Sequence, residues 1–281
     1  MAQFLVVRHL VAPLMDTAAS KQVAWRIRDA WFCVLALVVS QFIVLFWLRF
    51  AARSSPAFDH WWASSFGTGV IYLIQDALWV FIALWFSRVE AVRDFLEPAG
   101  LRRGFSILGW CAAWLAIAIA VIDDYGASRS WTASSSQHYA AGYGSFGISW
   151  WYFTLSAILV APFCEEVATR GFLYPAFRRH YSLVISTLII ICFSAYFHKS
   201  SVFRSAFTFG CLGSLWVLLC IVRERTGSLW DCLLCHGVYN LVGLHLLIPA
   251  VFVVLLFLPI VMHPIYAKRR ETILAAQNRD A

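Results

Sequence analysis

The sequence predicts an all-α protein, a polytopic bundle of transmembrane helices, from three observations. Of its 281 residues, 61% are apolar and 13% are charged, whereas a soluble domain carries about a quarter charged residues. The apolar residues form long blocks that suit membrane spans. Seventeen of the 22 Lys and Arg residues fall in alternate connections, which predicts that both termini are cytoplasmic. The same distribution explains the net charge of +7 without a nucleic-acid partner.

We expect about eight spans in an integral membrane protein, and the short loops are typical of a bacterial inner (plasma) membrane. Residues 1–29 are expected to form a cytoplasmic amphipathic segment. Residues 30–147 hold N-terminal transmembrane helices and a Ser/Gly/Tyr-rich outer loop from residue 123. Residues 148–248 carry the polar motifs, and 249–281 form the last span and a basic cytoplasmic tail. The expected spans are roughly 30–48, 67–87, 105–122, 148–167, 181–198, 205–222, 229–248 and 250–266.

The stretch "APFCEEVATRGF" (161–172) places charged side chains after a long apolar run, where they are costly without a partner or a function. Consecutive helical residues differ by roughly 100° in direction, so Glu165 and Glu166 face different neighbours. Glu166 and Arg170 are spaced i, i+4 and can pair. Glu165 then faces a cavity, as suits a general base. The alternative is that both glutamates only cap the cytoplasmic side of the helix.

Two further stretches carry polar groups in predicted spans. His236 and Asn240 in "LLCHGVYNLVG" share a helix face, so Asn240 can orient the imidazole or donate to a developing oxyanion. An interhelical polar clamp is the alternative there. His198 ends the fifth span, where a lone histidine can also be interfacial. Simple helix ends separate Glu165 from His198, so they meet only if the fourth helix continues past Arg170, to about residue 177.

In this order, the three stretches resemble the CPBP family of membrane proteins, which includes the CAAX prenyl proteases of the Ras-converting type and bacterial relatives. The family pattern is EExxxR, then FxxxH, then HxxxN or HxxxD. The first and third motifs match, and "RTGSLWDCLLCH" (225–236) is similar to the family's lead into the third. In the middle motif Ser194 stands where the family has Phe, four residues before His198. The resemblance covers residues 148–248.

The resemblance implies an intramembrane glutamic endopeptidase that uses no metal or other cofactor. Glu165 would activate a water for attack on a peptide carbonyl, and His198 would help bind and deprotonate that water. His236 and Asn240 would stabilise the oxyanion. The implied partner in the bilayer is a membrane-anchored protein, lipidated or with a C-terminal sorting tail, cut near its C-terminus. Two residues would brace the site: Glu166 and Arg170.

Other interpretations stay open. Glu165, His198 and His236 would also make a three-ligand zinc site, and "CLLCH" (232–236) formally matches a haem-attachment pattern. A non-enzymatic scaffold or immunity protein is another class. A proton-coupled transporter would use Asp76 with the Glu/His set as a relay, although a helix–helix hydrogen bond is the simplest interpretation of Asp76.

Overall fold

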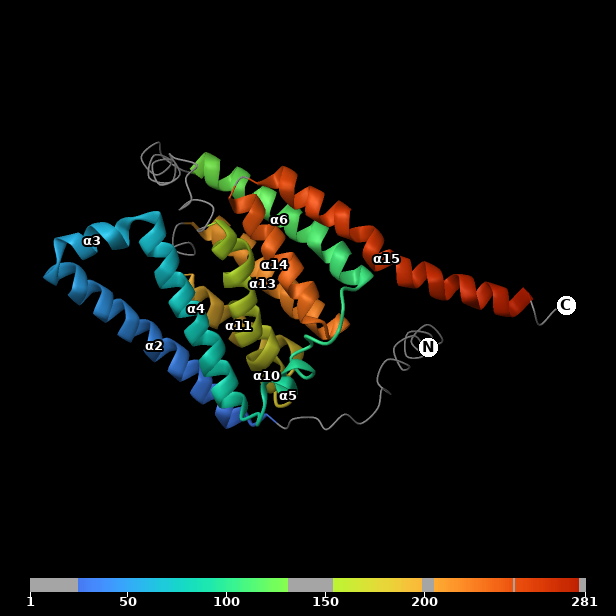
Figure 1. Cartoon of the computed structure of the whole chain (residues 1–281), viewed down its shortest axis with the longest axis horizontal. Coiled ribbons are helices and arrows are strands. Elements are labelled where there is room, and N and C mark those ends of the chain that lie inside the picture. Colours follow the sequence, from blue (N-terminus) through green and yellow to red (C-terminus); the bar gives the residue numbers. More distant parts are fainter. Residues whose placement is uncertain (1–24, 131–153, 199–204, 245, 278–281) are drawn as a thin grey trace.

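The computed structural model describes residues 25–130, 154–198, 205–244 and 246–277 (Figure 1). Within these residues every regular element is a helix, which confirms the all-α prediction. The expected amphipathic segment lies largely outside them. The longer helices are α2 (Ile27–Ser54), α4 (Ser65–Ser87), α6 (Ile107–Ser130), α11 (Leu183–Phe197), α13 (Ala206–Thr226), α14 (Leu229–Gly243) and α15 (Leu247–Gln277), and α3 (Pro56–Ala63) and α5 (Val92–Leu96) are short.

Four helices are long and apolar enough to cross a membrane: Ile27–Ser54, Gly69–Ser87, Ile107–Gly126 and Ala206–Thr226. Two shorter apolar helices, Leu183–Phe197 and Leu247–Met262, accompany them. These six coincide with expected spans, and together they support an integral membrane protein. The total of eight spans and the cytoplasmic termini stay predictions.

The structure corrects the start of the predicted outer loop. Helix α6 continues to Ser130, so residues 123–130 are helical, and the rest of that loop lies outside the described residues. Gly126 signals close helix packing here and not a turn, because a Cβ at this position would lie 2.0 Å from the Phe207 ring. The Tyr239 hydroxyl also donates to Asp123 at 2.7 Å, so α13 and α14 both hold this end of α6.

The seventh and eighth helices meet earlier than predicted. Helix α14 ends at Gly243, and α15 begins at Leu247 and runs to Gln277. Pro249 lies in the first turn of α15, where a backbone N–H has no intrahelical partner. The Leu246 N–H, in the connection, bonds the Leu241 carbonyl at 2.8 Å.

The helices pack around two buried clusters. In Figure 1, α2, α3 and α4 lie on one side, α6 and α15 on the other, and α11, α13 and α14 between them. One cluster joins α2, α4 and α11 to residues 167–177. The other joins α6, α13, α14 and α15. The polar motifs lie where these two clusters meet.

Candidate active site

The first motif lies on an irregular helix. Two π-helical segments, η2 (Ser156–Val160) and η3 (Val167–Leu173), flank α9 (Ala161–Glu166), and α10 (Tyr174–Arg178) follows. The helix therefore continues past Arg170 to Arg178, as required for Glu165 and His198 to meet. Each π segment ends two residues before a proline, Pro162 or Pro175. Proline lacks an N–H and crowds the preceding turn, which favours such wide turns.

Pro162 explains where Asn240 binds. In η2 the Ala161 N–H bonds the carbonyl five residues back, so the next carbonyl, that of Ala157, would need an N–H at position 162. Pro162 has none. The Asn240 side chain on α14 supplies the donor instead, at 2.8 Å from the Ala157 oxygen. The close approach depends on Gly237, because a Cβ there would lie 3.2 Å from the Ile158 oxygen.

Glu166 and Arg170 form the predicted i, i+4 pair. Arg170 Nη1 lies 3.2 Å from Glu166 Oε1, and both side chains are buried. Glu166 Oε1 also accepts from His236 Nδ1 at 2.9 Å. Glu166, and not Asn240, therefore orients the His236 ring, which corrects one of the two roles considered for Asn240.

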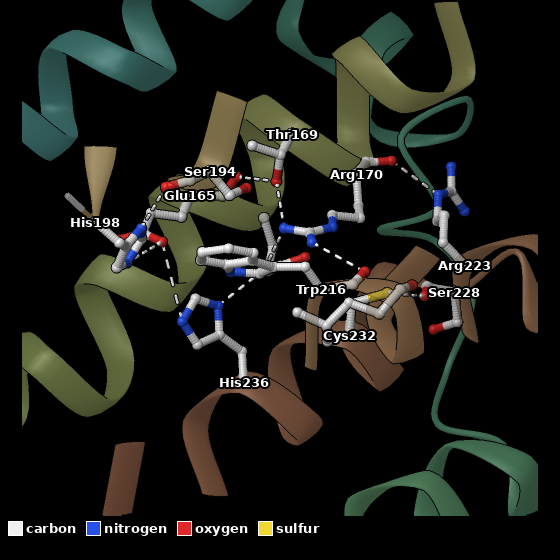
Figure 2. Close-up of polar contacts among 12 residues, drawn as sticks. Glu165, Thr169, Arg170, Ser194, His198, Trp216, Arg223, Ser228, Cys232 and His236 are labelled. Atoms are coloured by element: carbon white, nitrogen blue, oxygen red, sulfur yellow. Dashed lines mark hydrogen bonds and ion pairs between the residues drawn. The ribbon is translucent and has the colours of Figure 1, made fainter. Parts of the chain in front are cut away.

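Glu165 faces both motif histidines (Figure 2). Its Oε2 lies 3.8 Å from His198 Nε2 and 3.9 Å from His236 Nε2. These separations are too long for direct hydrogen bonds, and a water beside the three groups can bond to Glu165 and to either ring. The Glu165 side chain is 22% exposed, whereas that of Glu166 is fully buried. The two neighbouring glutamates therefore occupy different environments, as the helix geometry predicted.

His198 is held by its own helix end and by a tryptophan. Its Nδ1 lies 2.9 Å from the Ser194 carbonyl, and its ring lies against Trp216 with centroids 5.6 Å apart. The residue four before His198 thus contributes its backbone carbonyl, so the missing Phe does not displace the ring. Phe193 packs against Trp79 on α4 instead, with ring centroids 5.6 Å apart.

These contacts determine which ring nitrogen of each imidazole carries the proton. A carbonyl or a carboxylate only accepts, so Nδ1 must carry the proton in both rings. In a neutral ring Nε2 is then an acceptor, and in both histidines it points at Glu165. A water placed among these groups can donate to Glu165 and to one imidazole. When His236 is protonated, its Nε2 becomes a donor.

Arg170 is connected to the surrounding helices through backbone carbonyls. Its Nη2 donates to the Trp216 carbonyl at 3.4 Å, and its Nη1 to Thr169 Oγ1 at 3.0 Å. Its own carbonyl accepts from Arg223 Nε at 2.9 Å. Arg223 also donates to the carbonyls of Pro98 and Gly227, so the first motif is fixed to the turn that precedes α14.

The residues that lead into the third motif (225–236) form hydrogen bonds to the loop before α6. Trp230 Nε1 donates to the Leu101 carbonyl at 2.9 Å, and Ser228 Oγ to that of Gly104 at 3.0 Å. Asp231 accepts from the Ser106 N–H and hydroxyl, at 2.9 and 2.7 Å, and so caps α6 from a neighbouring helix. These bonds set the position of α14 and hence of His236.

The structure thus brings five of the six motif residues together, and it places Asn240 one turn from His236 on the Ala157 carbonyl. The sequence analysis missed Thr169, Trp216 and Arg223. Thr169 lies inside EExxxR, so the motif itself was a signal, but no local pattern marks the other two.

The Cys232 and Cys235 thiols of "CLLCH" are buried and lie near backbone carbonyls. Within the described residues, no group of three or more His, Cys, Asp or Glu side chains is arranged to hold a metal ion.

These features define the class: a helical integral membrane protein with a partly buried site of glutamates, histidines and an arginine. Residues 147–242 match the family model described as Rce1-like, Type II CAAX prenyl endopeptidase Rce1-like. This part of the chain is therefore similar to the CAAX prenyl endopeptidase family, as the motif resemblance predicted, and the match supports a membrane protease role. Comparisons with curated proteins and with solved structures found no match.

Proposed function

We propose that the protein is an intramembrane glutamic endopeptidase that hydrolyses a peptide bond near the C-terminus of a membrane-associated protein. One observation carries this proposal: Glu165 Oε2 lies 3.8 and 3.9 Å from the Nε2 atoms of His198 and His236. A carboxylate that faces two imidazole nitrogens is suited to binding and activating a water held beside all three groups. The partly exposed side chain of Glu165 allows water to reach it.

The proposed reaction follows from these positions. Glu165 takes one proton from the water, and His198 Nε2 accepts the other hydrogen as a hydrogen bond. The water oxygen attacks the peptide carbonyl carbon, and the charge moves to the carbonyl oxygen. Protonated His236 donates to that oxyanion from Nε2, and Asn240 offers its second amide N–H. The C–N bond then breaks, and Glu165 returns its proton to the leaving amine.

Glu166 and Arg170 are positioning residues in this proposal. The buried Arg170 guanidinium balances the charge of Glu166, and Glu166 holds His236 through Nδ1. Because the contact fixes the ring, Nε2 stays directed at the space beside Glu165. A 1 Å misplacement of a catalytic group can lower the rate about 100-fold, so the brace contributes to catalysis without touching the substrate.

The substrate we propose is prenylated, otherwise lipidated, or equipped with a C-terminal sorting tail, and the membrane is the bacterial inner membrane. Endopeptidases that act on prenylated proteins give the matched family its name. The surface of α2 and α4 exposes large apolar side chains along its length, as is needed for contact with acyl or prenyl chains within a bilayer.

A comparison of membrane-protein C-termini tests this function. Cells carrying the wild type would be compared with cells carrying Glu165→Gln, which keeps the side-chain shape and removes the base. We expect precursors with extended C-termini in the variant at normal protein level, and those precursors name the substrate. Identical termini in both strains would instead support the scaffold or transporter alternative.

A further inference from the structure

Trp216 lies in the centre of the candidate active site, although none of the three motifs contains it. It is the middle residue of α13 and is only 2% exposed. In Figure 2 its indole ring lies between the Arg170 guanidinium and His198. A side chain this buried does not contact a substrate, so Trp216 acts on the reaction only through the groups that it touches.

Two contacts of Trp216 reach residues of the motifs. Its ring lies against the His198 imidazole, with ring centroids 5.6 Å apart and planes at 56°, which is a favourable geometry for an aromatic pair. Its backbone carbonyl accepts from Arg170 Nη2 at 3.4 Å. Trp216 therefore connects the arginine of the first motif to the histidine of the second, through its backbone on one side and its ring on the other.

The His198 ring depends on a contact from a neighbouring helix. His198 is the C-cap of α11, and its side chain is 29% exposed. The contact between Nδ1 and the Ser194 carbonyl, at 2.9 Å, holds a single ring atom, so the ring can still turn about it. The indole packed against the imidazole restricts this rotation. Nε2 then stays directed at Glu165 Oε2, 3.8 Å away.

Arg170 reaches the other histidine by a separate route. Its Nη1 pairs with Glu166 Oε1 at 3.2 Å, and the same oxygen accepts from His236 Nδ1 at 2.9 Å. One guanidinium is therefore connected to both imidazoles, through Glu166 to His236 and through Trp216 to His198. Because the guanidinium is planar and rigid, the two rings are held relative to each other as well as to Glu165.

We propose that Trp216 is a positioning residue of this site, which orients His198 as Glu166 orients His236. The proposal rests on the proposed function and adds a residue that the motifs lack. The indole keeps His198 Nε2 directed at the water beside Glu165, so that this nitrogen accepts a hydrogen bond from the water during the attack. Loss of the ring slows the chemical step and leaves substrate binding unchanged, because Trp216 does not contact the substrate.

Kinetics of the purified full-length protein in lipid nanodiscs test this role with a matched pair of tryptophans. Trp216 and Trp110 are both 2% exposed and belong to one buried cluster, but the Trp110 ring packs against Phe105, at 5.8 Å between centroids. We expect Trp216→Leu to lower kcat about 10- to 100-fold at equal folded concentration, with KM unchanged. Trp216→Phe, which retains a ring, should recover most of this loss, and Trp110→Leu should keep the wild-type kcat.

Nitrogen-15 NMR of the histidine side chains provides a readout that does not depend on cleavage. His198→Gln identifies the His198 signals, and spectra are recorded at about pH 9, where ordinary imidazoles are neutral. In the wild type we expect one set of signals, with the proton on Nδ1. In Trp216→Leu the freed ring should give a mixture of both tautomers, whereas Trp110→Leu should match the wild type. Trp216→Met, which also lacks a ring, replaces Trp216→Leu if that variant does not fold.

The outcomes separate this proposal from the proposed function. An unchanged kcat in Trp216→Leu, or unchanged His198 signals in the same variant, overturns the positioning role even if the wild type cleaves its substrate. Equal losses of kcat in Trp216→Leu and Trp110→Leu also overturn it, because they would show a general effect of packing. His198 signals that depend on Trp216 in a protein that cleaves nothing overturn the protease proposal and leave the orientation of His198 by Trp216 standing.

Discussion

At the scale of single residues, the neighbours Glu165 and Glu166 show how one helical step separates two functions. Glu166 is enclosed between Arg170 and His236, at 3.2 and 2.9 Å. Glu165 contacts the histidines only across distances of 3.8 and 3.9 Å and reaches solvent. A buried carboxylate that pairs with two basic side chains contributes to the structure, and a partly exposed carboxylate that faces two imidazoles is available for proton transfer.

This difference predicts opposite effects on stability. Glu166→Gln leaves the buried Arg170 uncompensated and should destabilise the protein by about 3–5 kcal/mol. Glu165→Gln should change stability by less than about 1 kcal/mol. Thermal unfolding of both variants in the same detergent measures this. Equal losses would show that Glu165 is also a structural residue.

Asn240 should affect stability and catalysis together. Asn240→Ala leaves the Ala157 carbonyl without its donor, which costs about 1–3 kcal/mol. As an oxyanion donor it should also lower kcat about 100-fold or more. Unfolding and kinetics on one preparation separate these effects. A stability loss with unchanged kcat would limit Asn240 to the interhelical contact.

At the scale of elements, the site depends on the approach of α14 to the π-helical segment η2. Pro162 frees the Ala157 carbonyl, Asn240 binds it, and Gly237 allows the contact. The position of His236 therefore follows from a proline on one helix and a glycine on the other.

Two glycines of α14 make a matched pair for testing this contact. Gly237→Ala places a Cβ 3.2 Å from the Ile158 oxygen, whereas Gly243→Ala meets nothing within 4 Å. Alanine is otherwise better than glycine in a helix by about 1 kcal/mol. We expect Gly237→Ala to lower the cleavage rate at least about tenfold and Gly243→Ala to leave it unchanged. Equal rates would show that this approach does not set the position of His236.

At the scale of the whole molecule, two buried helical clusters meet at the site, and each supplies part of it. The cluster of α2, α4 and α11 contributes the first motif and His198. The cluster of α6, α13 and α14 contributes His236, Asn240 and Trp216. The arrangement brings charged groups into an apolar bundle, where the buried Glu166 pairs with Arg170 and His236.

The proposed mechanism makes a prediction about metal removal. In this mechanism Glu165 and the histidines bind and deprotonate the water without a metal ion. Excess EDTA or 1,10-phenanthroline should therefore not change the cleavage rate of purified protein. A rate that falls with chelator and returns with zinc would favour the zinc alternative for the same three residues.

The sequence predicted those parts of the molecule that depend on local spacing. The helical class, the Glu166–Arg170 pair and the different directions of Glu165 and Glu166 follow from composition and from 3.6-residue periodicity. The Ser194 carbonyl on His198, the Trp216 ring and the Arg223 bonds depend on backbone atoms and on contacts between distant helices, which spacing does not encode. The prediction of a loop from residue 123 was wrong over residues 123–130, because a glycine such as Gly126 can mark either a turn or a close helix contact.

The most direct test of the central claim is cleavage of the precursor by purified protein in lipid nanodiscs. Wild type, Glu165→Gln and, as a control for the environment, Gly243→Ala would be assayed at equal folded concentration. We predict that Glu165→Gln lowers the rate about 100- to 10,000-fold, while Gly243→Ala cleaves as the wild type does. Cleavage by Glu165→Gln at the wild-type rate would contradict the assignment of Glu165 as the base.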